Sequence, residues 1–198
     1  KISSCTNNAR IESDQAVGRA VLGGIVGHAL HNNTIEECTN NGDIAILNSA
    51  KTKIAAGIIA YDEKTNNGAS VTDCVNNGSI SAGSTAGDSY VSGIAAYARW
   101  TIKGCTNNGA VSLTSTAGGN LVAGIVASAT STSTIEECVN DVNGTVTVDY
   151  NKTSVKATAQ IGGVAGSCSA KKVYKCENKA AVNVAHHTKD GYSCTGGL

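Results

Sequence analysis

The segment AHHTKDGY, residues 185–192, is the most chemically varied stretch of this 198-residue chain. Its two histidines, lysine, aspartate and tyrosine could bind a metal ion or titrate near neutral pH. The segment YDEK, residues 61–64, and the pairs Glu36–Glu37 and Glu136–Glu137 offer carboxylates for acid–base chemistry. A polar loop is the simpler explanation of both segments. The glutamate pairs recur at one repeat position, and neighbours in a strand point to opposite faces, so their carboxylates do not converge.

No spacing typical of a known catalytic or cofactor site accompanies these residues. The sequence has no Gly-x-Ser-x-Gly, His-Glu-x-x-His or phosphate-loop pattern. The segment GGIVG at 23–27 lacks the third glycine, the helix and the downstream acid of a dinucleotide-binding fingerprint. We therefore predict a non-enzymatic chain with no catalytic residue, no metal and no cofactor.

Six cysteines recur at nearly even intervals of 33, 36, 31, 33 and 38 residues. They are Cys5, Cys38, Cys74, Cys105, Cys138 and Cys176. Without a Cys-x-x-Cys pair or a histidine partner, this series does not indicate a zinc site. Stacked cysteines would be close enough for disulfides, but their Cβ atoms would point in parallel, so we expect mostly free, buried thiols. Cys168 and Cys194 lie outside the series, and their pairing stays open.

Each cysteine of the series belongs to a repeated phrase. An Ile or Val precedes it by three residues and an Asn follows it by two, as in TIEECTNNGDI at 34–44. A second phrase alternates with the first, and its copies are GGIVG at 23–27, AGIIA at 56–60, SGIAA at 92–96, AGIVA at 123–127 and GGVAG at 162–166. The cysteine precedes the central glycine by 19 residues in the first four repeats, so the two phrases are phased.

The composition favours strands over helices. There are 23 Gly, no Pro and no Phe, and the apolar runs are short, Gly-rich and β-branched. Ankyrin and tetratricopeptide repeats have similar lengths, but they need longer amphipathic stretches than this chain offers.

We predict an all-β fold, a right-handed parallel β-helix (β-solenoid) of about six coils with repeats of about 33 residues, as a single domain over 1–198. In such a stack the cysteines fill a narrow core. Each Asn is expected at a bend, where its amide binds the Asn of the next coil and its backbone tolerates the left-handed conformation.

The glycine phrases resemble the GLUG motif of large secreted and cell-surface bacterial proteins, including adhesin-like ones. The companion phrase ECTNNGDI at 37–44 is similar to Cys-x-Asn-x-Gly repeats in surface proteins of gut Bacteroidetes. This resemblance covers nearly the whole chain, but three of five glycine phrases carry Ala or Ser at an outer position. It implies a right-handed parallel β-helix on an exported protein, secreted or held outside the bacterial outer membrane. It transfers no catalytic residue.

Charge and hydropathy restrict the partners. The 15 basic and 15 acidic side chains balance, which argues against a nucleic-acid partner, and no apolar run approaches the roughly 20 residues needed to span a bilayer. Neither end reads as a solenoid cap, so we expect a segment of a longer protein whose neighbouring domains cover the coil ends.

Exposed aromatic rings are a further indication of binding, because sugars stack on them. Tyr61 and Tyr97 each follow a central glycine by four residues, so we expect them to stack on one face, although ordinary packing at a corner would also explain them. Insertions at 62–70 and 141–160 interrupt the regular repeat. The predicted binding surface comprises Tyr61, Asp62, Tyr97, Trp100, Asp149 and Tyr150.

These observations favour a non-enzymatic, adhesin-like binding module or rigid spacer that displays loops to a host protein or glycan. The alternative is a polysaccharide-active enzyme, a lyase or hydrolase, on the same fold. It would need three or more carboxylates in one groove, or a bound Ca²⁺. A purely structural stalk is a third possibility.

Overall fold

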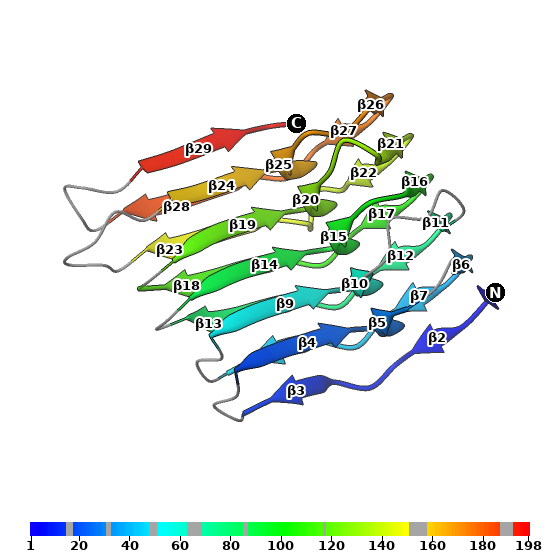
Figure 1. Ribbon diagram of the computed structural model, residues 1–198, viewed down its shortest axis with the longest axis horizontal. Coiled ribbons are helices and arrows are strands. Elements are labelled where there is room, and N and C mark those ends of the chain that lie inside the picture. The colour runs from blue at the N-terminus through cyan, green and yellow to red at the C-terminus, as the bar shows by residue number, and fades with distance from the viewer. Residues whose placement is uncertain are drawn as a thin grey trace.

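The computed structural model describes residues 1–14, 18–30, 33–47, 51–62, 69–84, 87–116, 118–150, 158–186 and 192–198. Throughout these residues the regular structure is β-strand, and no helix occurs among them. Figure 1 shows the strands stacked turn upon turn from the N-terminus to the C-terminus. No helix in this part of the chain is long and apolar enough to cross a membrane.

The strands form five parallel sheets that run along the stack. The first sheet contains β1 (Ile2–Ser3), β6 (Thr34–Glu36), β11 (Ser70–Thr72), β16 (Thr101–Lys103), β21 (Thr134–Glu136) and β26 (Lys172–Tyr174). The second contains β2 (Thr6–Asn7), β7 (Thr39–Asn40), β12 (Val75–Asn76), β17 (Thr106–Asn107), β22 (Val139–Asn140) and β27 (Glu177–Asn178). The third contains β3 (Ile11–Ser13), β8 (Ile44–Ile46), β13 (Ile80–Ser84), β18 (Val111–Ser115), β23 (Val146–Tyr150) and β28 (Val182–His186).

The two remaining sheets carry the glycine phrases at their junction. The fourth sheet contains β4 (Arg19–Gly23), β9 (Thr52–Ala56), β14 (Asp88–Ser92), β19 (Gly119–Ala123), β24 (Thr158–Gly162) and β29 (Tyr192–Gly196). The fifth contains β5 (Val26–Ala29), β10 (Ile59–Asp62), β15 (Ala95–Ala98), β20 (Val126–Ala129) and β25 (Ala165–Cys168). The predicted parallel β-solenoid is confirmed, with five complete turns and a sixth that has four strands, where about six coils were expected.

The stacking is in register, so equivalent residues of the repeat form columns. In the first sheet Ile35 pairs with both Ile2 and Val71. In the second sheet Asn76 pairs with both Asn40 and Asn107. Each residue therefore meets its own counterpart one turn away, about 4.8 Å along the axis. Stacking of this kind explains why the chain repeats the same phrase.

The interior has two apolar lobes. One lobe lies between the first and fifth sheets and holds the stacked cysteines with residues such as Ile58 and Ile94. The other lies between the third and fourth sheets and is filled by residues such as Ile80, Val111 and Val122. Both lobes are filled mainly by small or β-branched side chains, because a thin tube leaves little room for larger ones, and Trp100 in the first lobe is an exception.

The column of asparagines lies between the two lobes, where the tube is narrowest. Asn107 is completely buried, and a Cβ atom added to Gly93 would overlap its side chain. The same relation holds between Asn76 and Gly57. The asparagines of the first phrase thus meet the glycines of the second phrase across the tube, which explains why the two phrases keep a fixed spacing.

One detail of the prediction was wrong, because the asparagines do not adopt the left-handed conformation. That conformation falls on the residue before each cysteine of the series, with φ between 51° and 63°. These residues are Ser4, Glu37, Asp73, Gly104, Glu137 and Lys175. The asparagines lie in extended strands instead, since only an extended backbone points their amides into the tube.

The fourth and fifth sheets also share an apolar cluster on their outer faces. Ile54 and Ala56 of β9 and Ala60 of β10 pack together there, with Ala96 of β15. Ala55 and Ile59, neighbours of these residues in the chain, point to the opposite face and belong to the internal lobes. The two sheets therefore meet at an inward bend, and the outside of that bend forms a groove.

Candidate functional site

Aromatic side chains gather along this outer groove in the first three turns. His28, Tyr61 and Tyr97 occupy one column of the fifth sheet, and His28 and Tyr61 are register partners. The ring centroids of His28 and Tyr61 are 5.2 Å apart, and those of Tyr61 and Tyr97 are 5.7 Å apart. Tyr90 approaches from β14 and meets Tyr97 edge to face at 6.1 Å. These separations are typical of favourable aromatic contacts.

Two arginines flank the tyrosines. The guanidinium of Arg19, at the start of β4, lies over the ring of Tyr61 at 4.2 Å from its centroid. The guanidinium of Arg99, just after β15, lies 5.0 Å from the ring centroid of Tyr97, and its Nη2 donates to the Tyr97 hydroxyl at 3.4 Å. The Nε of Arg99 is buried and has no hydrogen-bond partner. Cation–π contacts hold both arginines beside the rings and leave donors available.

Together these side chains enclose an open pocket of about 340 Å³, lined by Arg19, Thr52, Ile54, Tyr61, Tyr90, Tyr97 and Arg99. We call it the tyrosine–arginine cleft. Its volume is at the lower end of the range for small-ligand sites, about 300–1,000 Å³. None of the seven lining residues carries a negative charge, whereas two are cationic.

The electrostatics keep the cleft cationic at neutral pH. Burial, followed by the nearby charge of Asp88, raises the pKa of the Tyr90 hydroxyl, so this phenol remains protonated and can donate a hydrogen bond. Asp88 itself lies on β14, where its carboxylate accepts the N–H of Gly119 at 2.8 Å. An arginine guanidinium carries a positive charge in proteins, so Arg19 and Arg99 make the cleft cationic.

Within the described residues, the cleft does not recur in the next turn of the solenoid. One turn beyond Tyr97 the same column holds Ser128, and one turn beyond Tyr90 it holds Leu121. Since register gives every turn an equivalent position, the fold itself accepts small or aliphatic residues there. The aromatic rings are therefore not a requirement of the stacking.

The predicted surface residues are not all on the surface. Tyr61 and Tyr97 stack as expected. Trp100 is 4% exposed and packs in the internal lobe with the cysteines, and Tyr150 and Asp62 are each 1% exposed. Asp149 is half-buried on β23 of the third sheet, away from the cleft. Trp100, Tyr150 and Asp62 are therefore too buried to form a binding surface, whereas Asp149 keeps partial exposure.

Much of the histidine segment at 185–192 and of the two insertions lies outside the described residues. The positions concerned are 187–191 of the histidine segment and 63–68 and 151–157 of the insertions. Within the part of the chain that the structure describes, no group of three or more His, Cys, Asp or Glu side chains could hold a metal ion.

Arg19, Tyr90 and Arg99 were absent from the predicted surface. Arg99 stands two residues after Tyr97, so both can reach one side of the fifth sheet, and this spacing was an available signal. Tyr90 and Arg19 come from a different sheet. Only the bend between the fourth and fifth sheets brings them to Tyr61 and Tyr97, and sequence spacing does not reveal that bend.

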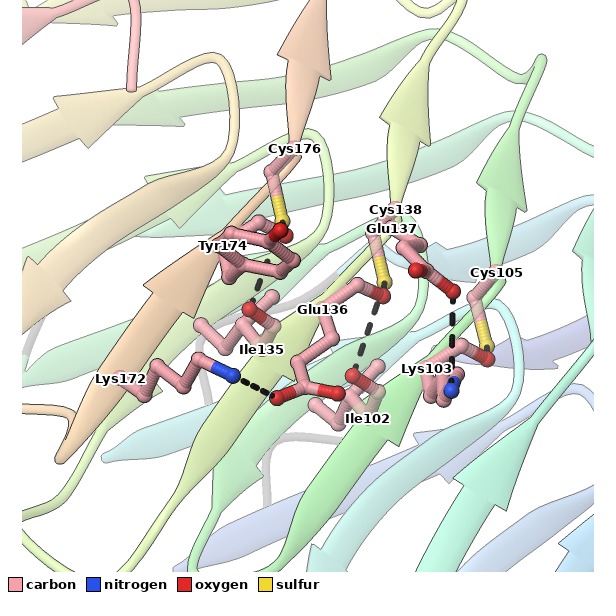
Figure 2. A network of polar contacts seen from close by, with 10 residues as sticks. All are labelled: Ile102, Lys103, Cys105, Ile135, Glu136, Glu137, Cys138, Lys172, Tyr174 and Cys176. Carbon is pink, nitrogen blue, oxygen red and sulfur yellow. Dashed lines mark hydrogen bonds and ion pairs between the residues drawn. The ribbon is translucent and has the colours of Figure 1, made fainter.

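The cysteine column lies inside the tube, in the lobe between the first and fifth sheets. Figure 2 shows Cys105, Cys138 and Cys176 in a row. The Cys138 thiol donates to the carbonyl of Glu136 at 3.2 Å and lies 3.7 Å from the carbonyl of Ile102, one turn away. Contact with the neighbouring thiols, together with burial, raises the pKa of Cys105 well above its ordinary value. Four of the six thiols of the column are buried in the apolar lobe, where they pack as small apolar side chains.

The disulfide prediction can be compared directly with these thiols. Four of the six cysteines in the series are buried, and no disulfide occurs among the described residues, as expected. Cys168 and Cys194, whose pairing stayed open, are both exposed and are not joined to each other.

Ion pairs lie on the solvent-facing side of the first sheet. The Lys172 ammonium donates to the Glu136 carboxylate at 2.7 Å, and Lys103 lies 3.6 Å from Glu137 (Figure 2). Glu136 and Glu137 are therefore partners of cations on neighbouring turns, whereas Glu37 accepts a hydrogen bond from the Ser4 hydroxyl at 3.1 Å. They do not converge on a common site, in agreement with the explanation by repeat ancestry.

The fold and the cleft place this chain in the class of parallel β-helix proteins with a surface pocket on one flank. No protein-family model, curated protein or solved structure matches the chain.

Proposed function

We propose that this chain is a non-enzymatic, adhesin-like binding module of an exported bacterial protein, in which a rigid solenoid presents the tyrosine–arginine cleft to a glycan. The single observation that carries the proposal is the cleft itself. It is a cluster of three tyrosines and two arginines whose columns hold serine and leucine one turn further on, whereas the asparagine column follows the repeat.

Aromatic faces suit a saccharide partner. The C–H groups of a sugar ring form an apolar face that packs on a tyrosine ring, and phenol hydroxyls donate to sugar oxygens. The rings of Tyr61, Tyr90 and Tyr97 are already held by one another and by the two arginines. Little side-chain entropy is lost on binding to such a preorganised surface.

The scaffold suits display. Parallel ladders connect every turn to the next, and buried asparagine amides reinforce them at 2.7–2.8 Å. A rod of this kind holds the cleft at a fixed distance from whatever lies at either end. The resemblance of the glycine phrases to GLUG repeats supports a place on the cell surface or in the secreted fraction.

A glycan array probed with the wild-type chain and with the double variant Tyr90→Leu/Tyr97→Ser tests the proposal. The variant carries the residues that the same columns hold one turn further on, so it removes the cleft without introducing a side chain foreign to the column. We expect the wild type to bind a defined subset of glycans and the variant to lose at least tenfold in affinity. Equal binding by both proteins would contradict the proposal.

The same screen addresses the enzymatic alternative. Incubation of each bound polysaccharide with the wild-type chain, followed by an assay for new reducing ends or unsaturated products, is expected to show no turnover. Product formation that scales with protein concentration would replace the binding module by a lyase or hydrolase.

A further inference from the structure

We infer that the ligand of the tyrosine–arginine cleft is a saccharide that carries a carboxylate, of the uronic-acid or sialic-acid type, with Arg19 and Arg99 binding the carboxylate and the tyrosines stacking on the sugar ring. This inference rests on the proposed function and adds the chemical class of its ligand.

The first reason is charge complementarity. The chain as a whole has a net charge of zero, yet the residues that line the cleft are two arginines and five uncharged side chains. The charge of Asp88 acts on the cleft by raising the pKa of Tyr90, but the Asp88 carboxylate already accepts a hydrogen bond from the Gly119 N–H. A neutral sugar would leave this local positive charge uncompensated, whereas an anionic one neutralises it.

The second reason is the unused hydrogen-bonding capacity of Arg99. Its Nε is buried without a partner, and its Nη2 makes only a long contact of 3.4 Å with the Tyr97 hydroxyl. A long contact of this kind leaves the terminal amino groups of the guanidinium available for stronger, charge-assisted hydrogen bonds. An incoming carboxylate would supply the acceptors for them.

The third reason is the combination of sugar-binding and anion-binding groups in one small volume. Arg19 lies over the ring of Tyr61 and Arg99 over the ring of Tyr97, so each cation is in contact with a tyrosine of the cleft. The cleft of about 340 Å³ has room for about one or two sugar rings. An acidic monosaccharide unit can therefore contact a ring and a guanidinium together.

Isothermal titration with matched oligosaccharides tests the inference. The pairs are oligogalacturonate with the neutral galactose oligomer of the same length, and sialyl-lactose with lactose; a sulfated disaccharide separates carboxylate from sulfate recognition. We expect at least one carboxylated member to bind at least tenfold more tightly than its neutral parent. This preference should shrink as the salt concentration rises, because the arginines are solvent-accessible.

Variants assign the preference to the arginines. Arg99→Gln and Arg19→Gln should each weaken binding of the carboxylated sugar about tenfold, as expected for loss of one charge-assisted hydrogen bond. Neither should change the affinity for the neutral parent. The control is Arg10→Gln, which removes an arginine that pairs with Glu12 outside the cleft. If Arg99→Gln does not fold, Arg99→Thr replaces it, since Thr130 occupies the corresponding place one turn on.

The outcomes separate the inference from the proposed function. Equal binding of neutral and carboxylated sugars, or sulfate binding without carboxylate binding, overturns the carboxylate assignment but leaves a glycan-binding cleft. Unchanged affinity in both arginine variants also overturns it. Glycan binding that persists in Tyr90→Leu/Tyr97→Ser overturns the proposed function together with the inference.

Discussion

The asparagine column of the second sheet and the tyrosine–arginine cleft are both built from stacked side chains, yet they follow opposite rules. Each buried asparagine from Asn40 to Asn140 finds its partner in its own counterpart one turn away. In the cleft, by contrast, Tyr61 contacts a histidine, an arginine and a tyrosine, and the turns beyond hold serine and leucine in the same columns.

This difference indicates that the fold requires the asparagine column, whereas it only tolerates the side chains of the cleft. In a solenoid, a residue that recurs in every turn is explained by the turn above and the turn below, and it requires no ligand. A cluster that interrupts its columns has no such explanation. Irregularity within the repeat is therefore the better guide to function in this molecule, and conspicuous regular residues such as the cysteines are the better guide to stability.

The largest effect is expected when the asparagine column is broken. Asn107→Ala removes the amide that accepts from Asn76 and donates to Asn140 and to the Gly109 carbonyl, and it leaves all three groups buried. With about 1–3 kcal/mol for each unsatisfied group, the free energy of unfolding should fall by at least about 3 kcal/mol. Chemical denaturation followed by circular dichroism measures this change.

The matched control for that substitution is the next residue in the chain. Asn108 donates to Asn77 at 2.8 Å in a second, solvent-exposed ladder. Asn108→Ala should cost less than about 1 kcal/mol, because water replaces an exposed hydrogen bond. Similar losses in the two variants would mean that burial of the inner column is not what makes it important.

The glycine opposite the column should be almost as sensitive. A Cβ atom on Gly93 would overlap the Asn107 side chain and the backbone of Gly124, neither of which can withdraw within a narrow tube. Gly93→Ala should destabilise the fold by about 2–4 kcal/mol. Gly83→Ala is the control, since a Cβ there would be 3.6 Å from its nearest neighbour, and it should leave the thermal midpoint within a few degrees.

The cleft residues should be far less important for stability. Tyr90→Leu and Tyr97→Ser substitute residues that the next turn already accommodates, so we expect each to change the free energy of unfolding by less than about 1.5 kcal/mol. Thermal denaturation measures the change. A loss as large as that of Asn107→Ala would show that the rings are structural after all, and the contrast between the two regions would disappear.

The thiols offer a comparison that requires no substitution. In the native protein a thiol reagent should label the exposed Cys5 and Cys168 rapidly, whereas the buried Cys74 and Cys105 should react only after unfolding. A reducing agent should not shift the unfolding midpoint, because no disulfide stabilises the described part of the fold. A midpoint that falls on reduction would contradict the packing of the column as free thiols.

The smallest effect concerns the surface pairs of the first sheet. The hydrogen bond from Lys172 lowers the pKa of Glu136 below its ordinary value of 4.5. The pair therefore contributes stability above that value and loses it as the pH falls through the lowered pKa. Glu136→Gln should lower the thermal midpoint slightly at pH 7, and the difference from wild type should vanish in acid. A difference that persists at low pH would exclude this ion pair as its source.

Much of the fold was predictable from the sequence, but little of the candidate site was. The fixed spacing from each cysteine to its asparagine and to the glycine phrase defines the columns, so stacked turns followed from the spacing alone. Trp100 and Tyr150 show the limit, because an aromatic residue near a corner can turn inward or outward. Both were expected at the surface and both are buried. Local sequence does not encode which side of the chain faces the lobe.

By itself, the sequence determined that the chain coils into a parallel all-β stack with cysteines and asparagines aligned, because only in-register stacking gives every copy of the phrase an identical environment. The tertiary structure alone decided that the asparagines lie inside the tube against the glycines, and that Arg19 and Tyr90 meet Tyr61 and Tyr97. The alignment of cysteines and asparagines depends on the number of residues in each coil, which can be counted in the sequence. The meeting of the cleft residues depends on the angle between two sheets, which residue spacing does not reveal.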